Sequence, residues 1–255
     1  MNRSATRPFR RPLTAIGLAL ALLAGLYAAP AGATPFPNGY RFAQSVQLAG
    51  ANWTTLDDGL FEDLTIVVVD GAETSGERPG MTRYEPAIDV VYDRWETSDA
   101  GVTTHLTYRT IEPVEPAAFA FDPAMRRASV DVEVTLRGGT ICTYPGSDPP
   151  DGRHPASDFD EEEDDCTQLP AVPARVSLQW TGTGDIHRGN VRFRETFDAQ
   201  GRFFLHELTT SRDADVAGGV RLLAPAPAEL TLPERPADVG VLVRGRVREQ
   251  LVLPR

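Results

Sequence analysis

The chain has 255 residues, a formal net charge of −11 and 41% hydrophobic residues. A chain of this size can form one large domain or two small ones, with a core that needs no disulfide or metal to support it. The acidic balance argues against a nucleic-acid partner, because binding to phosphates requires a surplus of basic residues.

The first 33 residues have the three-part pattern of a secretory signal peptide. Four arginines and no acidic residue precede an apolar segment from Leu13 to Ala29, and the small residues 31–33 follow it. We predict cleavage after Ala33, which would change the net charge from −11 to −15 because the removed segment carries four arginines and no acid. The alternative is a retained N-terminal anchor. The pair Arg10-Arg11 leaves the choice between the general and the twin-arginine export route open.

The remaining 222 of the 255 residues contain no further apolar run long enough to span a membrane. We therefore expect the mature protein, residues 34–255, to be soluble and secreted or extracytoplasmic. The signal has a bacterial pattern, so the acceptor sequence Asn52-Trp53-Thr54 is not expected to carry a glycan.

The mature chain is predicted to be all-β. Nearly every patterned segment after residue 40 alternates with a period of two, and none keeps a helical period over eleven residues. In the clearest case, residues 128–137, four apolar side chains fall on one face and polar side chains on the other, as in a strand with one face in the core and one in water. Further strands are predicted at 43–53, 62–70, 87–96, 102–111, 117–121, 175–181, 190–198, 202–210, 216–223 and 241–253.

For four strands the alternation also predicts which side chains point inward. These are Val130, Val132, Val134 and Leu136 in 128–137, Val176, Leu178 and Trp180 in 175–181, Val191, Phe193 and Phe197 in 190–198, and Val241, Val243, Val247, Leu251 and Leu253 in the last strand.

Short glycine-containing connections favour hairpins at Ser98–Gly101 and Ala199–Gly201. Successive hairpins between long strands favour an antiparallel meander that forms a β-barrel or a two-sheet β-sandwich. Similar patterns follow Trp53-Thr54 and Trp180-Thr181, which suggests an internal duplication of a β unit. The alternative is a chance likeness between two strands that end in tryptophan.

The segment Ala224–Asp238 holds four prolines and is predicted to be an extended connector. Only one predicted strand follows it, and a lone strand cannot fold alone. That strand should pair back into the main sheet, so that residues 34–255 form a single all-β domain.

Cys142 and Cys166 are the only cysteines of a chain with an export signal, which favours a disulfide bond between them. The bond would tether an acidic loop, residues 142–166, because the stretch at 158–165 reads DFDEEEDD and carries seven carboxylates. This run lacks the glycine and alternating spacing of an EF-hand loop. A solvated loop is therefore the preferred interpretation, with calcium binding as the alternative. The group Asp213-Ala214-Asp215 is interpreted as a polar turn between strands in preference to a calcium loop.

No catalytic motif is found: the chain lacks a Gly-x-Ser-x-Gly elbow, a His-Glu-x-x-His pair and a phosphate-binding glycine loop. His206 and Glu207 form the most enzyme-like local group, but neighbouring residues of a strand point to opposite faces. We predict no catalytic residue, metal ligand or cofactor. Paired carboxylates can still meet in space, so an exported hydrolase stays the competing class.

Arginines recur on one face of two predicted strands. Arg244, Arg246 and Arg248 share a face of the last strand, and Arg192 and Arg194 share one of the strand 190–198. If these strands are neighbours, the arginines form a basic stripe for an anionic ligand or polymer. The alternative, which we prefer from the sequence, is that the stripe balances the acidic residues Asp131 and Glu133.

The sequence therefore predicts an exported β-protein that binds an unidentified small ligand or a component of the cell envelope. An exported hydrolase with carboxylates brought together in a cleft is the second hypothesis, and a calcium-dependent module is the third. Oligomeric state is not set by any of these patterns.

Overall fold

The computed structural model describes residues 40–75, 82–144, 165–197 and 201–252. These residues form strands joined by turns and irregular segments, without any helix in this part of the chain. The strands are β1 (Tyr40–Asp57), β2 (Leu60–Ser75), β3 (Thr82–Arg83), β4 (Ala87–Thr97), β5 (Thr103–Pro113), β6 (Phe119–Phe121), β7 (Arg127–Leu136), β8 (Thr140–Tyr144), β9 (Asp165–Gln168), β10 (Val172–Gly182), β11 (His187–Phe197), β12 (Gly201–Leu222) and β13 (Val239–Val252).

The period-two segments form strands because alternate side chains of a strand enter the core. In β10 the buried and exposed residues alternate without a break from Val172 to Thr181. The predicted inward residues Val176, Leu178 and Trp180 are at most 1% exposed. In β7 three of the four predicted residues are buried and Val132 is half-buried. These inward predictions are confirmed.

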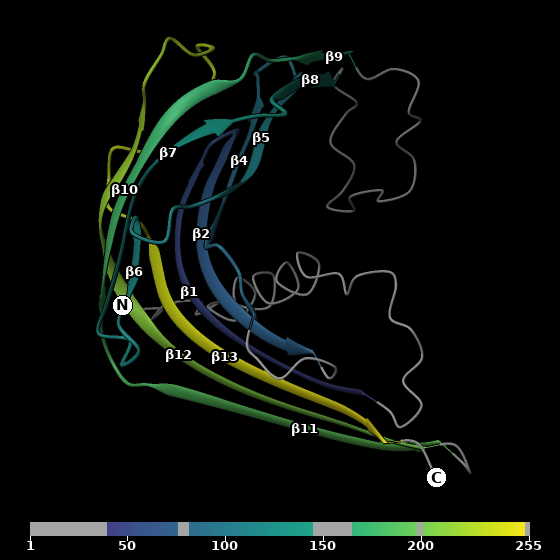
Figure 1. Cartoon of the computed structure of the whole chain (residues 1–255). Coiled ribbons are helices and arrows are strands. Elements are labelled where there is room, and N and C mark those ends of the chain that lie inside the picture. The colour runs from purple at the N-terminus through teal and green to yellow at the C-terminus, as the bar shows by residue number, and fades with distance from the viewer. Residues whose placement is uncertain (1–39, 76–81, 145–164, 198–200, 253–255) are drawn as a thin grey trace, which may run out of the picture.

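All the strand pairs are antiparallel, as predicted. The sheet order is β6-β7-β10-β12-β13-β1-β2-β4-β5-β8-β9, with β11 beside β12 and β3 beside β2. The sheet curves strongly (Figure 1) but is not closed, since the path of described strands ends at β6 and β9.

Strand β12 joins two layers of this sheet. Residues 202–213 pair with β13, whereas residues 214–222 pair with β10. At the point of change the chains are close, because a Cβ at Gly240 would lie 2.3 Å from the carbonyl oxygen of Ala214. The part of the sheet that contains β6, β7 and β10 thereby packs against β1, β2, β4 and β5, and one hydrophobic core lies between them.

The core combines residues from both layers. Its largest fully buried side chains include Trp180 of β10, Tyr92 of β4 and Tyr108 of β5. The indole nitrogen of Trp180 donates a hydrogen bond to the carbonyl oxygen of Gly50 in β1, at 2.8 Å. This bond joins the two layers directly.

The segment between β12 and β13 covers one end of the core, as an extended connector. Leu230 is buried, and the backbone carbonyl groups of Glu229 and Arg235 accept hydrogen bonds from Arg94 and from the indole of Trp53. Strand β13 then inserts between β12 and β1. The prediction that the last strand returns to the main sheet is confirmed.

The structure corrects one prediction about β12 and bears on a second. Asp213-Ala214-Asp215 is not a turn: it lies inside a continuous strand, with Ala214 buried and both aspartates exposed. The pairing agrees with a chance likeness between the two tryptophan-ended strands, the alternative to an internal duplication, because β2 pairs with β1 after Trp53, whereas β11 pairs with β12 and not with β10 after Trp180. The short strands β3, β8 and β9 were not predicted.

Cys142 and Cys166 form the predicted disulfide, with an S–S distance of 2.04 Å. They lie directly opposite each other on β8 and β9. The predicted hairpin at Ser98–Gly101 is present, with Gly101 in the left-handed region at φ 78°. The predicted signal peptide (1–33) and nearly all of the acidic run, up to residue 164, lie outside the described residues.

Candidate functional site

Strands β11, β12 and β13 extend past the two-layer body, and the first residues of β1 and the last residues of β2 continue the sheet beside β13. Strand β11 pairs with β12 only, among the described strands, and all its described side chains from His187 to Thr196 are exposed. On β13, Leu242 belongs to the core, but Arg246 and Arg248 on the same face are exposed. The boundary lies at Arg244, which donates a 2.7 Å hydrogen bond to the carbonyl oxygen of Pro123 in the β6–β7 loop.

The register of β11, β12 and β13 defines the surface beyond this boundary. Directly opposite residues of antiparallel strands share a face, and the two ladders run without interruption through this region. We call the resulting surface the basic face. Its four rows, each from β11 through β12 to β13, are Arg188–Thr210–Arg244, Asn190–Leu208–Arg246, Arg192–His206–Arg248 and Arg194–Phe204–Gln250.

The basic face contains six arginines, one histidine and no acidic residue. Five of these arginines are exposed, and Arg244 is half-buried. None of the six forms an ion pair with an acidic residue in the described ranges, although the chain as a whole has a net charge of −11. Unbalanced positive charge on one face of an acidic protein produces a local potential that attracts anions.

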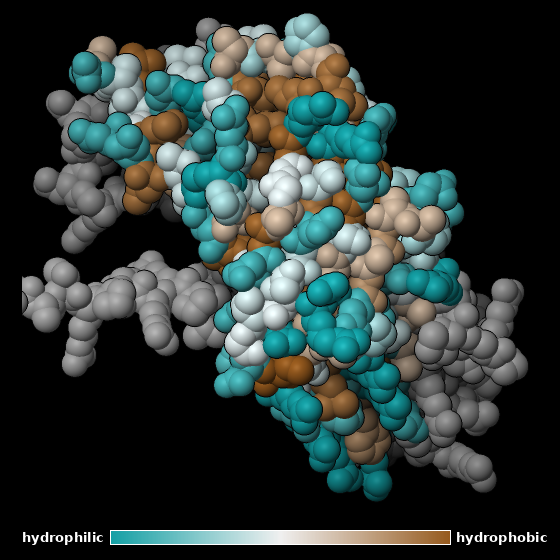
Figure 2. Space-filling model, turned by 90° about the vertical axis from the view of Figure 1, so that its left-hand side faces the viewer, coloured by the Kyte–Doolittle hydropathy of each residue, from teal (hydrophilic) through white to brown (hydrophobic). Residues whose placement is uncertain are grey.

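Side-chain contacts within the basic face confirm that the strands share it. The guanidinium carbon of Arg194 lies 5.5 Å from the ring centroid of Phe204, a cation–π contact. The Nε2 atom of His206 lies 3.2 Å from Oδ1 of Asn190. Both contacts connect β11 to β12. Figure 2 views the molecule from the left-hand side of Figure 1, and its lower part, at the height where Figure 1 places β11, β12 and β13, is mainly hydrophilic.

The preferred interpretation of the arginine stripe is wrong. Asp131 lies on β7, in the other layer, where Arg175 of β10 donates two hydrogen bonds to its carboxylate, at 2.8 and 2.9 Å. This bond lowers the pKa of Asp131. Asp131 therefore has its own cation, and it does not balance the arginines of β11 and β13. The stripe spans two strands that are separated by β12 and are not direct neighbours.

The inward prediction for the strand 190–198 is also wrong for its two described members. Val191 and Phe193 are 54% and 48% exposed, because no second layer of described strands covers β11. They lie on the face opposite the arginines, where Phe193 contacts Phe203 with ring centroids 6.4 Å apart. The three-strand extension is thus basic on one face and partly apolar on the other.

In β13 the inward prediction holds only in part. Val243 is buried as predicted, but Val241 and Val247 are half-buried, and the residue in the main core is Leu242, on the arginine side. Both faces of β13 are covered at this point, so that alternation alone does not identify the core side.

A second group of polar residues lies on β2, β4 and β5. Asp63 and Asp93 are directly opposite each other, and His105 lies 3.3 Å from Asp93. His105 also stacks on Trp95, with ring centroids 3.7 Å apart. The histidine contact is the main cause of a lowered pKa at Asp93.

Two carboxylates directly opposite each other are a candidate for the paired acids of a hydrolase. Asp63, however, accepts hydrogen bonds from Asn52, Thr54 and Thr65, at 2.8 to 3.0 Å. The lowered pKa keeps Asp93 ionised, so that it cannot serve as a proton donor at neutral pH. His206 and Glu207, the enzyme-like pair of the sequence, lie on opposite faces of β12, as expected.

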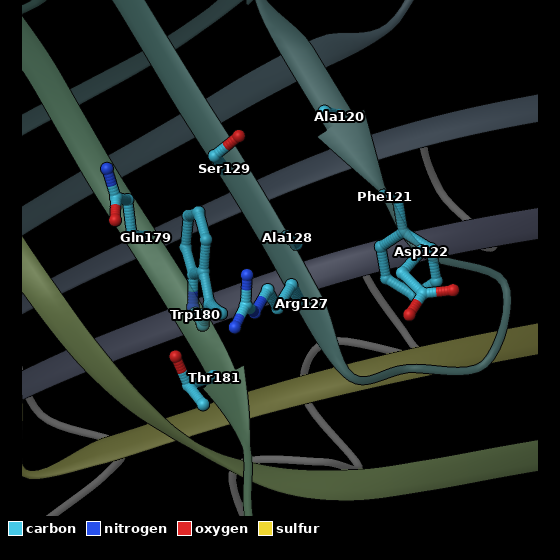
Figure 3. Close-up of a pocket in the computed structure, with 9 residues that line it drawn as sticks. All are labelled: Ala120, Phe121, Asp122, Arg127, Ala128, Ser129, Gln179, Trp180 and Thr181. Carbon is cyan, nitrogen blue, oxygen red and sulfur yellow. The ribbon is translucent and has the colours of Figure 1, made fainter.

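An open groove with a volume of about 700 Å³ lies over β6, β7 and β10 (Figure 3). Two of its polar side chains are engaged. Asp122 is bonded to Arg126 at 2.6 Å and to the backbone of Ala124, and the indole nitrogen of Trp180 is bonded to Gly50. Four others have no side-chain hydrogen bond or ion pair within the described ranges, namely Arg127, Ser129, Gln179 and Thr181. The groove therefore offers space and a few polar groups, but only one unpaired charge. Its lining residues are Ala120, Phe121, Asp122, Arg127, Ala128, Ser129, Gln179, Trp180 and Thr181.

Within the described ranges, no group of three or more His, Cys, Asp and Glu side chains could hold a metal ion. The same part of the chain contains no helix with the length and apolar character needed to cross a membrane. Comparison of the chain with protein-family models and with curated proteins gives no match.

The sequence identified five of the six arginines of the basic face. It also predicted a strand at 202–210, but not that this strand lies between the two arginine strands. Arg188 was outside the predicted strand, which began at residue 190. The alternation within β12 places three residues on one face, namely Phe204, His206 and Leu208. Their position between the two arginine strands depends on the order of the strands in the sheet. No local signal gives that order.

Proposed function

We propose that the protein is an exported binding protein that holds a polyanionic component of the cell envelope on its basic face. The observation that carries this proposal is the presence of six arginines and no acid over twelve adjacent positions of β11, β12 and β13. Arginine binds phosphate and carboxylate groups through paired hydrogen bonds and keeps its charge at any physiological pH.

The acidic remainder of the chain restricts polyanion binding to this face. A strongly acidic protein repels polyanions in general, so binding depends on one surface where the repulsion is reversed. The export signal pattern and the disulfide support a location outside the cytoplasm, where anionic envelope polymers occur. We do not adopt the hydrolase, because Asp63 and Asp93 are already held by neighbouring donors.

The test is a titration of the mature chain with long-chain polyphosphate by isothermal calorimetry, at low and at physiological salt. The binding variant is Arg192→Gln with Arg248→Gln, which removes the two cations on either side of His206. The matched control is Arg175→Gln with Arg221→Gln, an opposed arginine pair of β10 and β12 that lies outside the basic face. Both variants change the net charge by the same amount.

We expect the native chain and the control to bind with similar affinity and the binding variant to bind at least about tenfold more weakly, or about 1.4 kcal/mol. Equal weakening in both variants would show that net charge, and not the basic face, governs binding. Absence of binding to the native chain would reject the proposal.

A further inference from the structure

The arginines of the basic face are arranged regularly, and this arrangement restricts the class of ligand that can bind there. These arginines form two parallel columns, here called the β11 rail (Arg188, Arg192 and Arg194) and the β13 rail (Arg244, Arg246 and Arg248). Between them β12 presents Phe204, His206, Leu208 and Thr210, with no arginine in this stretch. Within these four rows the cations thus lie on two lines, separated by a floor of neutral and titratable side chains. Arg202 of β12, in the next row on the same face, is an exposed cation at the end of this floor.

The spacing follows from sheet geometry. Neighbouring strands are about 4.8 Å apart, so the rails are about 10 Å apart. Alternate residues of one strand are about 6.8 Å apart, and the rows from Arg188 to Arg194 extend over about 20 Å along β12. A single small anion can touch one or two arginines in this arrangement, but it cannot reach both rails along their length.

The central strand also explains how so many cations can share a face. Like charges directly opposite each other destabilise a sheet. Two of the four rows have an arginine on each rail, and in both of them a β12 residue separates the two arginines. No two arginines of the basic face are direct cross-strand partners. The floor is partly apolar, since Leu208 is 40% exposed, and Phe204 lies under the guanidinium group of Arg194.

We propose that the basic face binds a single linear polyanion that lies along β12 between the two rails, with its anionic groups directed alternately to β11 and to β13. This inference rests on the proposed function and specifies its ligand. The ligand class is an unbranched chain with regularly repeated phosphate groups. A point anion does not extend along both rails, and a duplex carries two backbones where the floor between the rails offers one path.

Two sets of measurements test the geometry by fluorescence anisotropy with the mature chain. The first compares unlabelled triphosphate, long-chain polyphosphate and duplex DNA as competitors of a labelled long-chain polyphosphate. The second compares two rail variants, Arg188→Gln with Arg192→Gln on β11 and Arg246→Gln with Arg248→Gln on β13. The control is again Arg175→Gln with Arg221→Gln, and unchanged thermal unfolding midpoints verify that each variant folds.

We expect long-chain polyphosphate to compete at least tenfold better than triphosphate at equal phosphate concentration, and better than duplex DNA. Each rail variant should lose affinity by a similar factor of at least about ten. An effect confined to one rail, equal competition by triphosphate or stronger competition by the duplex would overturn the two-rail arrangement while leaving anion binding intact. If the labelled polyphosphate does not bind at all, the proposed function itself fails.

Discussion

Replacement of Trp180 by phenylalanine tests whether the two layers pack as described. Trp180 is 1% exposed, and its indole nitrogen bonds to the carbonyl oxygen of Gly50 across the core. Loss of that donor leaves a buried carbonyl group without this partner, which costs about 1–3 kcal/mol. The smaller ring removes about 1 kcal/mol of apolar burial. We therefore expect Trp180→Phe to lower the free energy of unfolding by about 2–4 kcal/mol.

The assay is thermal and urea-induced unfolding of the mature chain, with Trp95→Phe as the matched control. Trp95 is 38% exposed and stacks on His105 at the surface, so its replacement should cost less than about 1 kcal/mol. For a domain of this size Trp180→Phe should lower the unfolding midpoint by roughly 4–16 °C. If the two substitutions destabilise the protein equally, Trp180 does not join the layers as described.

Three further predictions concern stability. Cys142→Ser with Cys166→Ser opens a bond across a sequence separation of 24 and should lower the free energy of unfolding by about 3.5 kcal/mol in urea titrations; an unchanged midpoint would contradict this. Burial raises the pKa of Asp89, whose Oδ1 has no hydrogen-bond partner in the described ranges. The ionised side chain therefore destabilises the folded state at pH values above the pKa that Asp89 has in the unfolded chain. Asp89→Asn should therefore stabilise the protein by about 1 kcal/mol at neutral pH, and the gain should disappear in acid; a loss at neutral pH would refute the reasoning. The hydrogen bond from His105 lowers the pKa of Asp93. Ionised Asp93 therefore stabilises the fold at pH values above its pKa in the unfolded chain, and this stabilisation is lost as the pH falls through its pKa in the folded protein. Asp93→Asn should cost less than about 1 kcal/mol at neutral pH, since the side chain is 35% exposed, and should flatten the acid part of the pH–stability curve; an unaltered curve would count against it.

Much of the fold could be predicted because alternation reports directly on burial. Strand β10 shows this best, since a layer covers one face over its whole length. The same rule failed for β11: Val191 and Phe193 alternate with arginines as core residues would, but none of the described strands covers either face of β11. A period of two separates the faces of a strand, and only the surrounding layers decide which face is buried.

The errors around β12 have a related cause. Asp213 and Asp215 suggested a turn, yet Ala214 and Val216 continue the apolar face between them, so one strand passes from β13 to β10 without interruption. The length of β12 could have been predicted from that continuity. Its change of partner could not, because it depends on the close approach of β12 to Gly240.

The sequence predicts which arginines share a face of one strand, but not which strands lie side by side. Parity alone places Arg192 with Arg194 and Arg246 with Arg248 on common faces. Whether those faces meet depends on the order β11-β12-β13, which is set by long-range pairing and has no local signature. From the sequence the acidic residues of β7 were the preferred neighbour of the arginines, and only the pairing of Asp131 with Arg175 excludes them.

The most direct test of the basic face is the salt dependence of polyphosphate binding. Five of its arginines are exposed and have no ion-pair partner in the described ranges. For proteins that bind single-stranded nucleic acids, each phosphate contact contributes about −0.7 to the slope of log affinity against log salt concentration. If polyphosphate follows the same rule, five contacts predict a slope of about −3.5. The Arg192→Gln with Arg248→Gln variant should reduce its magnitude by about 1.4, and the Arg175→Gln with Arg221→Gln control should leave it unchanged. A slope near zero, or the same slope in all three proteins, would contradict polyanion binding by the basic face.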